Sequence, residues 1–248
     1  MWSPEILIAT ALIFLLGGIV KGVSGIGLPT VTIVLMAAFV GLKEGIALMI
    51  LPTFVTNVWQ GLVGGYLLKL LRRMWSLLLM AAVGAWIGAG ILAGADAMYL
   101  AAFLGVLLCV YSAVSLVTPQ VPPPGRAEPW LSPIVGGTAG LIGGMTGNYA
   151  VPGAVYLQAL GLPRDALVQA LGIAFLFFTL VLGLALAWHG VMTPSAGALS
   201  AAAVAPSLAG MAFGQRLRRH LSESAFRRIF FVLLMGMGAW LIVRPFIG

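Results

Sequence analysis

The sequence has very few charged residues. Of its 248 residues, 8% are charged and 61% are hydrophobic, whereas about a quarter of the residues in soluble domains are charged. The mean hydropathy is +1.11. These values exclude a soluble globular protein and predict an all-α polytopic membrane protein. The net charge of +7 does not indicate nucleic-acid binding, because the basic residues gather in short stretches beside long apolar runs, as orientation signals do.

Acidic residues and cysteine are also scarce. All six acidic residues lie in expected loops or at segment ends, whereas a cation site or a proton relay normally needs a carboxylate inside a span. This favours an anionic or neutral substrate, although a sodium site built from backbone carbonyls stays open. The single cysteine, Cys109, excludes an intrachain disulfide. No cleaved signal peptide is expected, because the first residues carry no basic region.

Glycine is abundant, and two glycine-rich stretches share one pattern. Each has glycines at relative positions 1, 5 and 8, a hydroxyl residue before the last glycine, and a proline soon after it. The positions are Gly18, Gly22, Ser24, Gly25 and Pro29 in the first copy and Gly140, Gly144, Thr146, Gly147 and Pro152 in the second. Glycine costs about 1 kcal/mol inside a helix and proline about 3 kcal/mol, so a helix break is expected in each copy, with simple kinks as the alternative. Paired breaks in two halves indicate a transporter's binding site.

Six apolar runs are long enough to cross a membrane, which takes about 20 residues. They are 45–68, 74–94, 98–118, 166–188, 195–214 and 226–247. The runs beside the two breaks are shorter. Segments 6–41 and 131–161 are therefore each predicted to be a helical hairpin with the glycine motif at its tip, or alternatively a pair of short tilted spans. The total is about 8–10 membrane segments.

The chain divides into two similar halves. Residues 1–118 form the first membrane repeat, 119–130 a proline-rich cytoplasmic linker and 131–248 the second repeat, and together they make one transport domain. Basic residues follow the first long span of the first half, at 69–73, but the second long span of the second half, at 215–219. By the positive-inside rule the halves are therefore inverted repeats. Each has a glycine-broken hairpin and three long transmembrane helices, and both termini lie in the periplasm.

Few polar residues are expected inside the membrane. Lys21 is a charge within an apolar segment, and it either supplies positive potential to an anion site or snorkels to the interface. Thr53, Thr56, Asn57 and Gln60 fall on one helical face, where they either bind oxyanion oxygens or join helices. The residues predicted to bind the substrate are Lys21, Ser24, Gly25, Gly27, Thr53, Asn57, Gln60, Thr146, Gly147, Asn148, Tyr149 and Gln169.

An intramembrane protease is an alternative that the sequence disfavours. Gly22 to Gly25 fit the G-x-S-G pattern of rhomboid-like serine proteases. Such an enzyme needs a histidine near the serine at membrane depth. His189 lies at a span end and His220 in a basic stretch, so we expect no catalytic residues, no metal and no enzyme.

The repeated break resembles that of the TauE/SafE family of sulfite and organosulfonate exporters. The resemblance covers essentially the whole chain and includes the Gly-Leu turns at Gly41 and Gly161. The family commonly has a Gly-Ile-Gly-Gly-Gly run where this chain has Gly-Ile-Gly-Leu-Pro and Gly-Asn-Tyr-Ala-Val-Pro. Its motif residues here are Gly18, Gly22, Gly25, Gly27, Pro29, Gly140, Gly144, Gly147 and Pro152.

The resemblance implies a secondary transporter of the bacterial inner membrane. It would export a small sulfur-containing or carboxylate anion by alternating access. An ion-coupled importer or a channel for another small solute is the alternative. The expected partners are the anion and the lipid bilayer, with no nucleic acid and no cofactor. Coupling to a proton or a sodium ion and assembly as a homodimer stay open.

Overall fold

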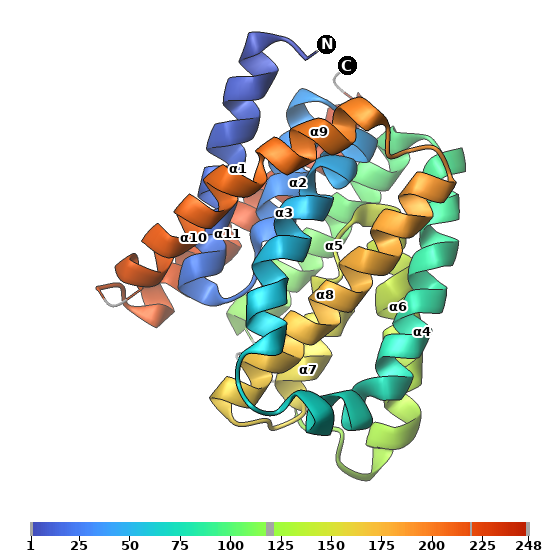
Figure 1. Cartoon of the computed structure of the whole chain (residues 1–248), viewed down its shortest axis with the longest axis vertical. Coiled ribbons are helices and arrows are strands. Elements are labelled where there is room, and N and C mark those ends of the chain that lie inside the picture. The colour runs from blue at the N-terminus through green and yellow to red at the C-terminus, as the bar shows by residue number, and fades with distance from the viewer. Residues whose placement is uncertain (1, 118–121, 219, 247–248) are drawn as a thin grey trace. The chain divides into compact units, whose positions relative to one another are not determined.

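The computed structural model describes residues 2–117, 122–218 and 220–246, and this part of the chain is all-helical (Figure 1). Predicted positions 118–121 of the linker region and Arg219 of the second basic stretch lie outside the described residues. The α-helices are α1 (Pro4–Ser24), α2 (Leu28–Phe39), α3 (Leu42–Leu62), α4 (Leu67–Gly94), α5 (Ala97–Val117), α6 (Glu128–Thr146), α7 (Val155–Ala159), α8 (Arg164–Trp188), α9 (Pro194–Ala202), α10 (Val204–Leu217) and α11 (Glu223–Val243). Short 3-10 or π segments are η1 (Gly125–Ala127), η2 (Ala150–Ala154) and η3 (Arg244–Phe246).

Seven helices in the described part of the chain are long and apolar enough to cross a membrane. They are α1, α3, α4, α5, α8, α9 with α10, and α11. The six predicted long spans are all among them, so that prediction is confirmed. The span predicted at 195–214 is divided into α9 and α10 at Ala203, just before Pro206, which has no N–H to continue the helical ladder.

Two stretches outside the expected long spans are helical. Residues 69–73 are not a loop but belong to the first turns of α4, which begins at Leu67. Helix α6 begins at Glu128 with Pro129 in its first turn, so the last residues of the expected linker 119–130 are helical. A proline at that position loses no hydrogen bond, since the first N–H groups of a helix have no partner within it.

The first glycine unit is a hairpin with unequal arms. Helix α1 has 21 residues and α2 has 12, or about 31 Å and 18 Å at 1.5 Å per residue. The two arms are closely packed, because a Cβ atom on Gly17 of α1 would lie 2.6 Å from Cγ2 of Thr32 in α2. At the second glycine-rich stretch, α6 before the break has 19 residues, whereas η2 and α7 after it have five each.

The helices form two compact units that do not coincide with the sequence halves. Unit 1 contains Met1–Pro52, Ala95–Pro119 and Pro194–Gly248, and unit 2 contains Thr53–Gly94 and Gln120–Thr193. Helix α3 contributes to both units, and its division falls at Pro52. Each unit therefore draws helices from both sequence halves.

Unit 1 is built around two glycine-mediated helix pairs. In the pair α1–α10, a Cβ on Gly18 would lie 2.3 Å from the carbonyl oxygen of Ser207, and one on Gly214 would lie 2.2 Å from that of Ile19. In the pair α5–α11, a Cβ on Gly105 would lie 2.6 Å from the carbonyl oxygen of Gly238. Real Cβ atoms do not approach so closely, so the backbones meet only because these residues lack side chains.

Unit 2 contains the same kind of pair, formed by α4 and α6, which lie side by side in Figure 1. A Cβ on Gly140 would lie 2.2 Å from the carbonyl oxygen of Ala81, and one on Gly84 would lie 2.3 Å from that of Gly137. In the alignment of the sequence halves, α6 corresponds to α1 and α4 to α9 with α10. The helix before each break therefore packs through its motif glycines against corresponding partners.

Candidate functional site

Both glycine motifs end their helix in the same way. Helix α1 is followed by Gly25 with φ 81°, whose N–H donates to the carbonyl of Lys21 at 2.7 Å. Helix α6 is followed by Gly147 with φ 74°, whose N–H donates to the carbonyl of Gly143 at 2.6 Å. Only glycine adopts this left-handed conformation without strain. The predicted breaks are therefore present, and each begins at the third glycine of its motif.

The hydroxyl residue of each motif holds the break in shape. Ser24 Oγ donates to the carbonyl of Val20 at 2.8 Å and accepts from Ile26 N at 3.3 Å. Thr146 Oγ1 donates to the carbonyl of Ile142 at 2.7 Å and accepts from Asn148 N at 3.3 Å. The two hydroxyls thus bridge the last helical turn to the residue beyond the glycine, at the same relative positions.

The chain continues differently after the two breaks. Gly27, with φ 103°, precedes α2, and no side chain caps that helix. The positive end of the α2 dipole therefore lies at the first break. At the second break, Asn148 Oδ1 accepts from Ala150 N at 3.0 Å, and the chain enters the π segment η2. Asn148 is buried, with 2% of its surface exposed.

Lys21 lies in the last turn of α1, one turn before the first break. It is 4% exposed and is the only charged residue among the described side chains that is buried. A buried cation in a membrane protein is unfavourable unless other groups compensate for its lost hydration.

Tyr149 is the largest buried side chain at the second break. Its ring stacks on Phe178 at 4.9 Å between centroids and meets Phe175 edge-on at 5.6 Å. Gly153 leaves room for this ring, because a Cβ there would lie 2.6 Å from Tyr149 Cε1. The Tyr149 hydroxyl has no hydrogen-bond partner within the described residues, and a buried unsatisfied hydroxyl costs about 1–3 kcal/mol.

The amide side chains on the polar face of α3 form hydrogen bonds with backbone carbonyl groups of the protein. Asn57 Nδ2 donates to the carbonyl of Thr53 at 2.9 Å, and both residues are buried. Gln60 Nε2 donates to the carbonyl of Val168 in α8 at 3.0 Å. Gln169 of α8 donates to the carbonyl of Gly61 at 3.0 Å and accepts from Tyr66 N at 2.9 Å. Gln60 and Gln169 therefore join α3 to α8, which was the alternative interpretation for polar residues on this face.

The predicted site residues are distributed over both units. Lys21, Ser24, Gly25 and Gly27 belong to unit 1, and the others to unit 2. The selection from sequence omitted Thr179 of α8, whose buried hydroxyl, like that of Tyr149, has no partner within the described residues. In the sequence, Thr179 is recognisable only as a hydroxyl residue within an apolar run. No group of three metal-ligating side chains occurs in the described chain.

Comparison with known proteins assigns the family. The model of the sulfite exporter TauE/SafE family matches residues 10–241, which include both breaks and all seven candidate spans in whole or in part. The chain belongs to the TauE/SafE family. It is therefore a multi-pass membrane protein of a transporter family and not of an enzyme family, so the protease alternative is removed. No curated protein and no solved structure matches the chain.

Proposed function

We propose that this TauE/SafE protein is a secondary transporter that exports a small oxyanion, such as sulfite or an organosulfonate, across the bacterial inner membrane by alternating access. The observation that carries the proposal is the buried Lys21, one turn before the break that leads into the N-terminus of α2, where no side chain caps the helix. No acidic side chain is buried among those that the structure describes. A positive site without a carboxylate favours an anion over a cation.

Each break, within its own unit, has donors of the kind that an oxyanion requires. Lys21 contributes charge, and the backbone around Gly25 and Gly27 contributes N–H groups near a positive helix end. The second break, in unit 2, has an amide and a hydroxyl of its own, from Asn148 and Tyr149. A buried hydroxyl that lacks a protein partner, as in Tyr149, gains a hydrogen bond when the anion arrives. Thr53, Asn57, Gln60, Thr146, Gly147 and Gln169 hold the helices and breaks that present these groups.

We also propose that the two halves are inverted repeats, with both termini in the periplasm. The support is the displaced positive charge in the sequence, together with the equivalent hydrogen bonding of the two breaks and the equivalent glycine pairs α1–α10 and α4–α6. Labelling single cysteines at positions 73 and 218, in a Cys109→Ser background, tests the orientation. Both positions are expected to label from the cytoplasm, and labelling from opposite faces would refute the inversion.

Uptake into proteoliposomes tests the site. Lys21→Met is expected to weaken sulfite binding at least tenfold, because it removes the buried charge, whereas the matched control Lys69→Met, at an exposed position, is expected to match wild type. Lys21→Arg retains the charge and shows whether folding survives the change of shape. Unchanged affinity in a folded Lys21→Met protein would remove Lys21 from the site. A thermal-shift panel of sulfite, sulfate, thiosulfate, sulfonates and carboxylates then identifies the anion.

Imposed ion gradients distinguish the class of transporter. Flux that follows the anion gradient alone, without response to a proton or sodium gradient, is expected for an uncoupled exporter. A dependence on either cation gradient would instead identify an ion-coupled mechanism, and flux that does not saturate with substrate would identify a channel.

A further inference from the structure

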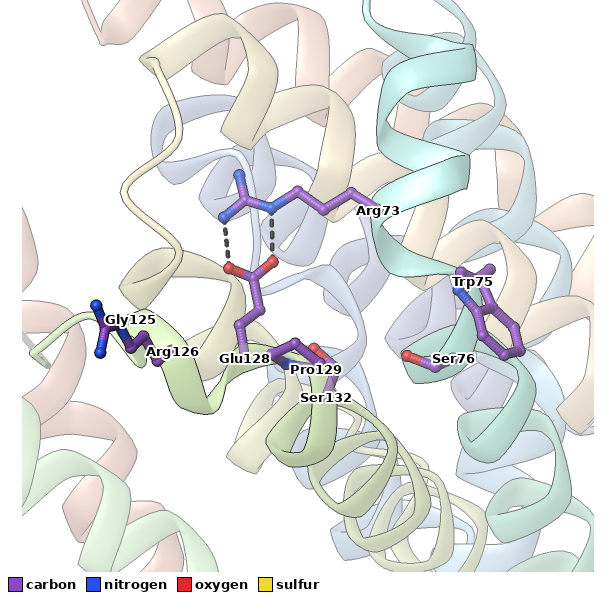
Figure 2. Close-up of a pocket in the computed structure, with 8 residues that line it drawn as sticks. All are labelled: Arg73, Trp75, Ser76, Gly125, Arg126, Glu128, Pro129 and Ser132. Carbon is purple, nitrogen blue, oxygen red and sulfur yellow. Dashed lines mark hydrogen bonds and ion pairs between the residues drawn. The ribbon is translucent and has the colours of Figure 1, made fainter.

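Unit 2 carries an open pocket of about 460 Å³, away from the glycine breaks in sequence, with charged groups in a largely apolar wall. Its wall includes Arg73, Trp75 and Ser76 from α4, Arg126 from η1, and Glu128 and Ser132 from α6. Figure 2 shows Arg73 reaching from α4 to Glu128, with Ser76 and Trp75 on one side of this ion pair and Arg126 on the other, where its side chain points outward. None of these residues belongs to the substrate site proposed above.

The charges of this pocket do not cancel. Arg73 Nε and Nη2 donate to the two oxygens of Glu128 at 2.6 and 2.8 Å, and Nη2 also donates to the carbonyl of Leu160 at 3.3 Å. That fork neutralises Arg73. Arg126 is exposed and makes no hydrogen bond or ion pair within the described residues. The pocket therefore keeps one positive charge.

The residues around the pocket are of the kinds found at the level of lipid headgroups. Lys69 and Arg72 are exposed in the first turns of α4. Trp75 and Trp130 are 64% and 60% exposed. Indole rings and basic side chains at the end of a membrane-spanning helix are typical of the interface between hydrocarbon and water. An open pocket at this level faces the phosphates of the bilayer.

We propose that this pocket binds the phosphate group of an anionic phospholipid. A phosphodiester carries one negative charge, which matches the single charge left on Arg126. Ser76 makes no hydrogen bond within the described residues and lines the α4 side of the pocket. The pocket lies between the start of α4 and the start of α6, so a bound lipid joins the two helices that form the glycine pair of unit 2.

Glu128 restrains the affinity of this site. Hydrogen bonds from Arg73 lower the pKa of the Glu128 carboxyl, so the carboxylate is charged at neutral pH and opposes a second negative group. Removal of that charge by Glu128→Gln therefore strengthens phosphate binding, whereas a residue with only a structural role would not increase affinity when replaced. An increase in phosphate affinity for Glu128→Gln therefore distinguishes a lipid site from an ion pair that only joins α4 to α6.

Native mass spectrometry and thermal shift of the purified full chain test the proposal, with dihexanoylphosphatidylglycerol, dihexanoylphosphatidylcholine and inorganic phosphate as probes. Phosphatidylglycerol is expected to bind best. Arg126→Gln is expected to weaken it at least fivefold, because a charge-assisted hydrogen bond to the phosphate is lost, and Glu128→Gln to strengthen it. The matched control Arg72→Gln, an exposed neighbour outside the pocket, is expected to match wild type.

Three results would overturn the assignment. Equal binding of phosphatidylcholine and phosphatidylglycerol would exclude charge recognition. Equal losses in Arg126→Gln and Arg72→Gln would show a diffuse surface effect. Stabilisation by inorganic phosphate as large as that by phosphatidylglycerol would assign the pocket to a free anion instead of a lipid.

Discussion

Gly140 offers a direct measure of how closely α4 and α6 must approach. In Gly140→Ala the new Cβ would lie 2.2 Å from the carbonyl oxygen of Ala81, and also 2.8 Å from its Cα. These are backbone atoms that cannot rotate away, so the helices must separate by roughly 1 Å. Overpacking of this kind costs about 1–3 kcal/mol, whereas alanine in place of glycine returns about 0.5–1 kcal/mol of helix propensity.

The net destabilisation expected for Gly140→Ala is about 1–2 kcal/mol, which lowers the apparent Tm by roughly 3–6 °C. Intrinsic tryptophan fluorescence during heating in detergent measures it, at a fixed scan rate because membrane proteins unfold irreversibly. The matched control is Gly236→Ala in α11, where a Cβ meets nothing within 4 Å, and its Tm is expected to stay equal or rise. Gly18→Ala, with a Cβ 2.3 Å from the Ser207 oxygen, is expected to behave like Gly140→Ala. Equal Tm values for Gly140→Ala and Gly236→Ala would refute the close packing.

Three further predictions concern the second break and the pocket of unit 2. Thr146→Ala is expected to lower stability by about 1–2 kcal/mol, since the Asn148 N–H loses its acceptor, and Thr146→Ser to restore most of it; equal Tm values for the two would contradict the bridging role. Tyr149→Phe is expected to leave Tm unchanged or higher, because the lost hydroxyl has no partner within the described residues, while oxyanion affinity falls in the same thermal-shift assay. The Glu128 carboxyl has a folded-state pKa below its ordinary value of about 4.3, through hydrogen bonds from Arg73. Its contribution to stability is therefore present above that pH and lost as pH falls through the lower folded value. Glu128→Gln should flatten this acid limb, by a small amount because both side chains are partly exposed.

The long spans were predictable because hydrophobic length is a direct physical requirement of the bilayer. The breaks were predictable for a similar reason, since Gly25 and Gly147 occupy positions that other residues adopt only with strain. The start of α4 could not be predicted from the sequence. Basic residues such as Lys69 and Arg73 are common in loops but equally suit a helical turn at the membrane interface. The division of the chain into units was not predictable either, because the sequence repeat says which helices correspond and not which helices touch.

The candidate site was only partly accessible from sequence. A buried lysine and a paired break are visible as exceptions within apolar runs. The roles of Gln60 and Gln169 are not, because an amide that joins two helices and an amide that binds a ligand lie equally well on one polar face. The structure separates these roles for the two glutamines, whose amides bond to backbone groups across α3 and α8. The lack of a partner for the hydroxyl of Tyr149 depends on the packing of distant Phe175 and Phe178, which no local pattern specifies.

The interleaved composition of the two units also sets an order of assembly during synthesis. Unit 2 is complete once Thr193 has been made, whereas α1, at the start of unit 1, pairs with α10, which begins at Val204. At about 5–20 residues per second, α1 waits roughly 10–40 s in the membrane before its partner is made. During that interval Gly18 and Gly22 are without the helix they are shaped to contact. Unit 2 is therefore fully synthesised before unit 1, and a nascent chain that stops before α10 leaves α1 without the helix that packs against it.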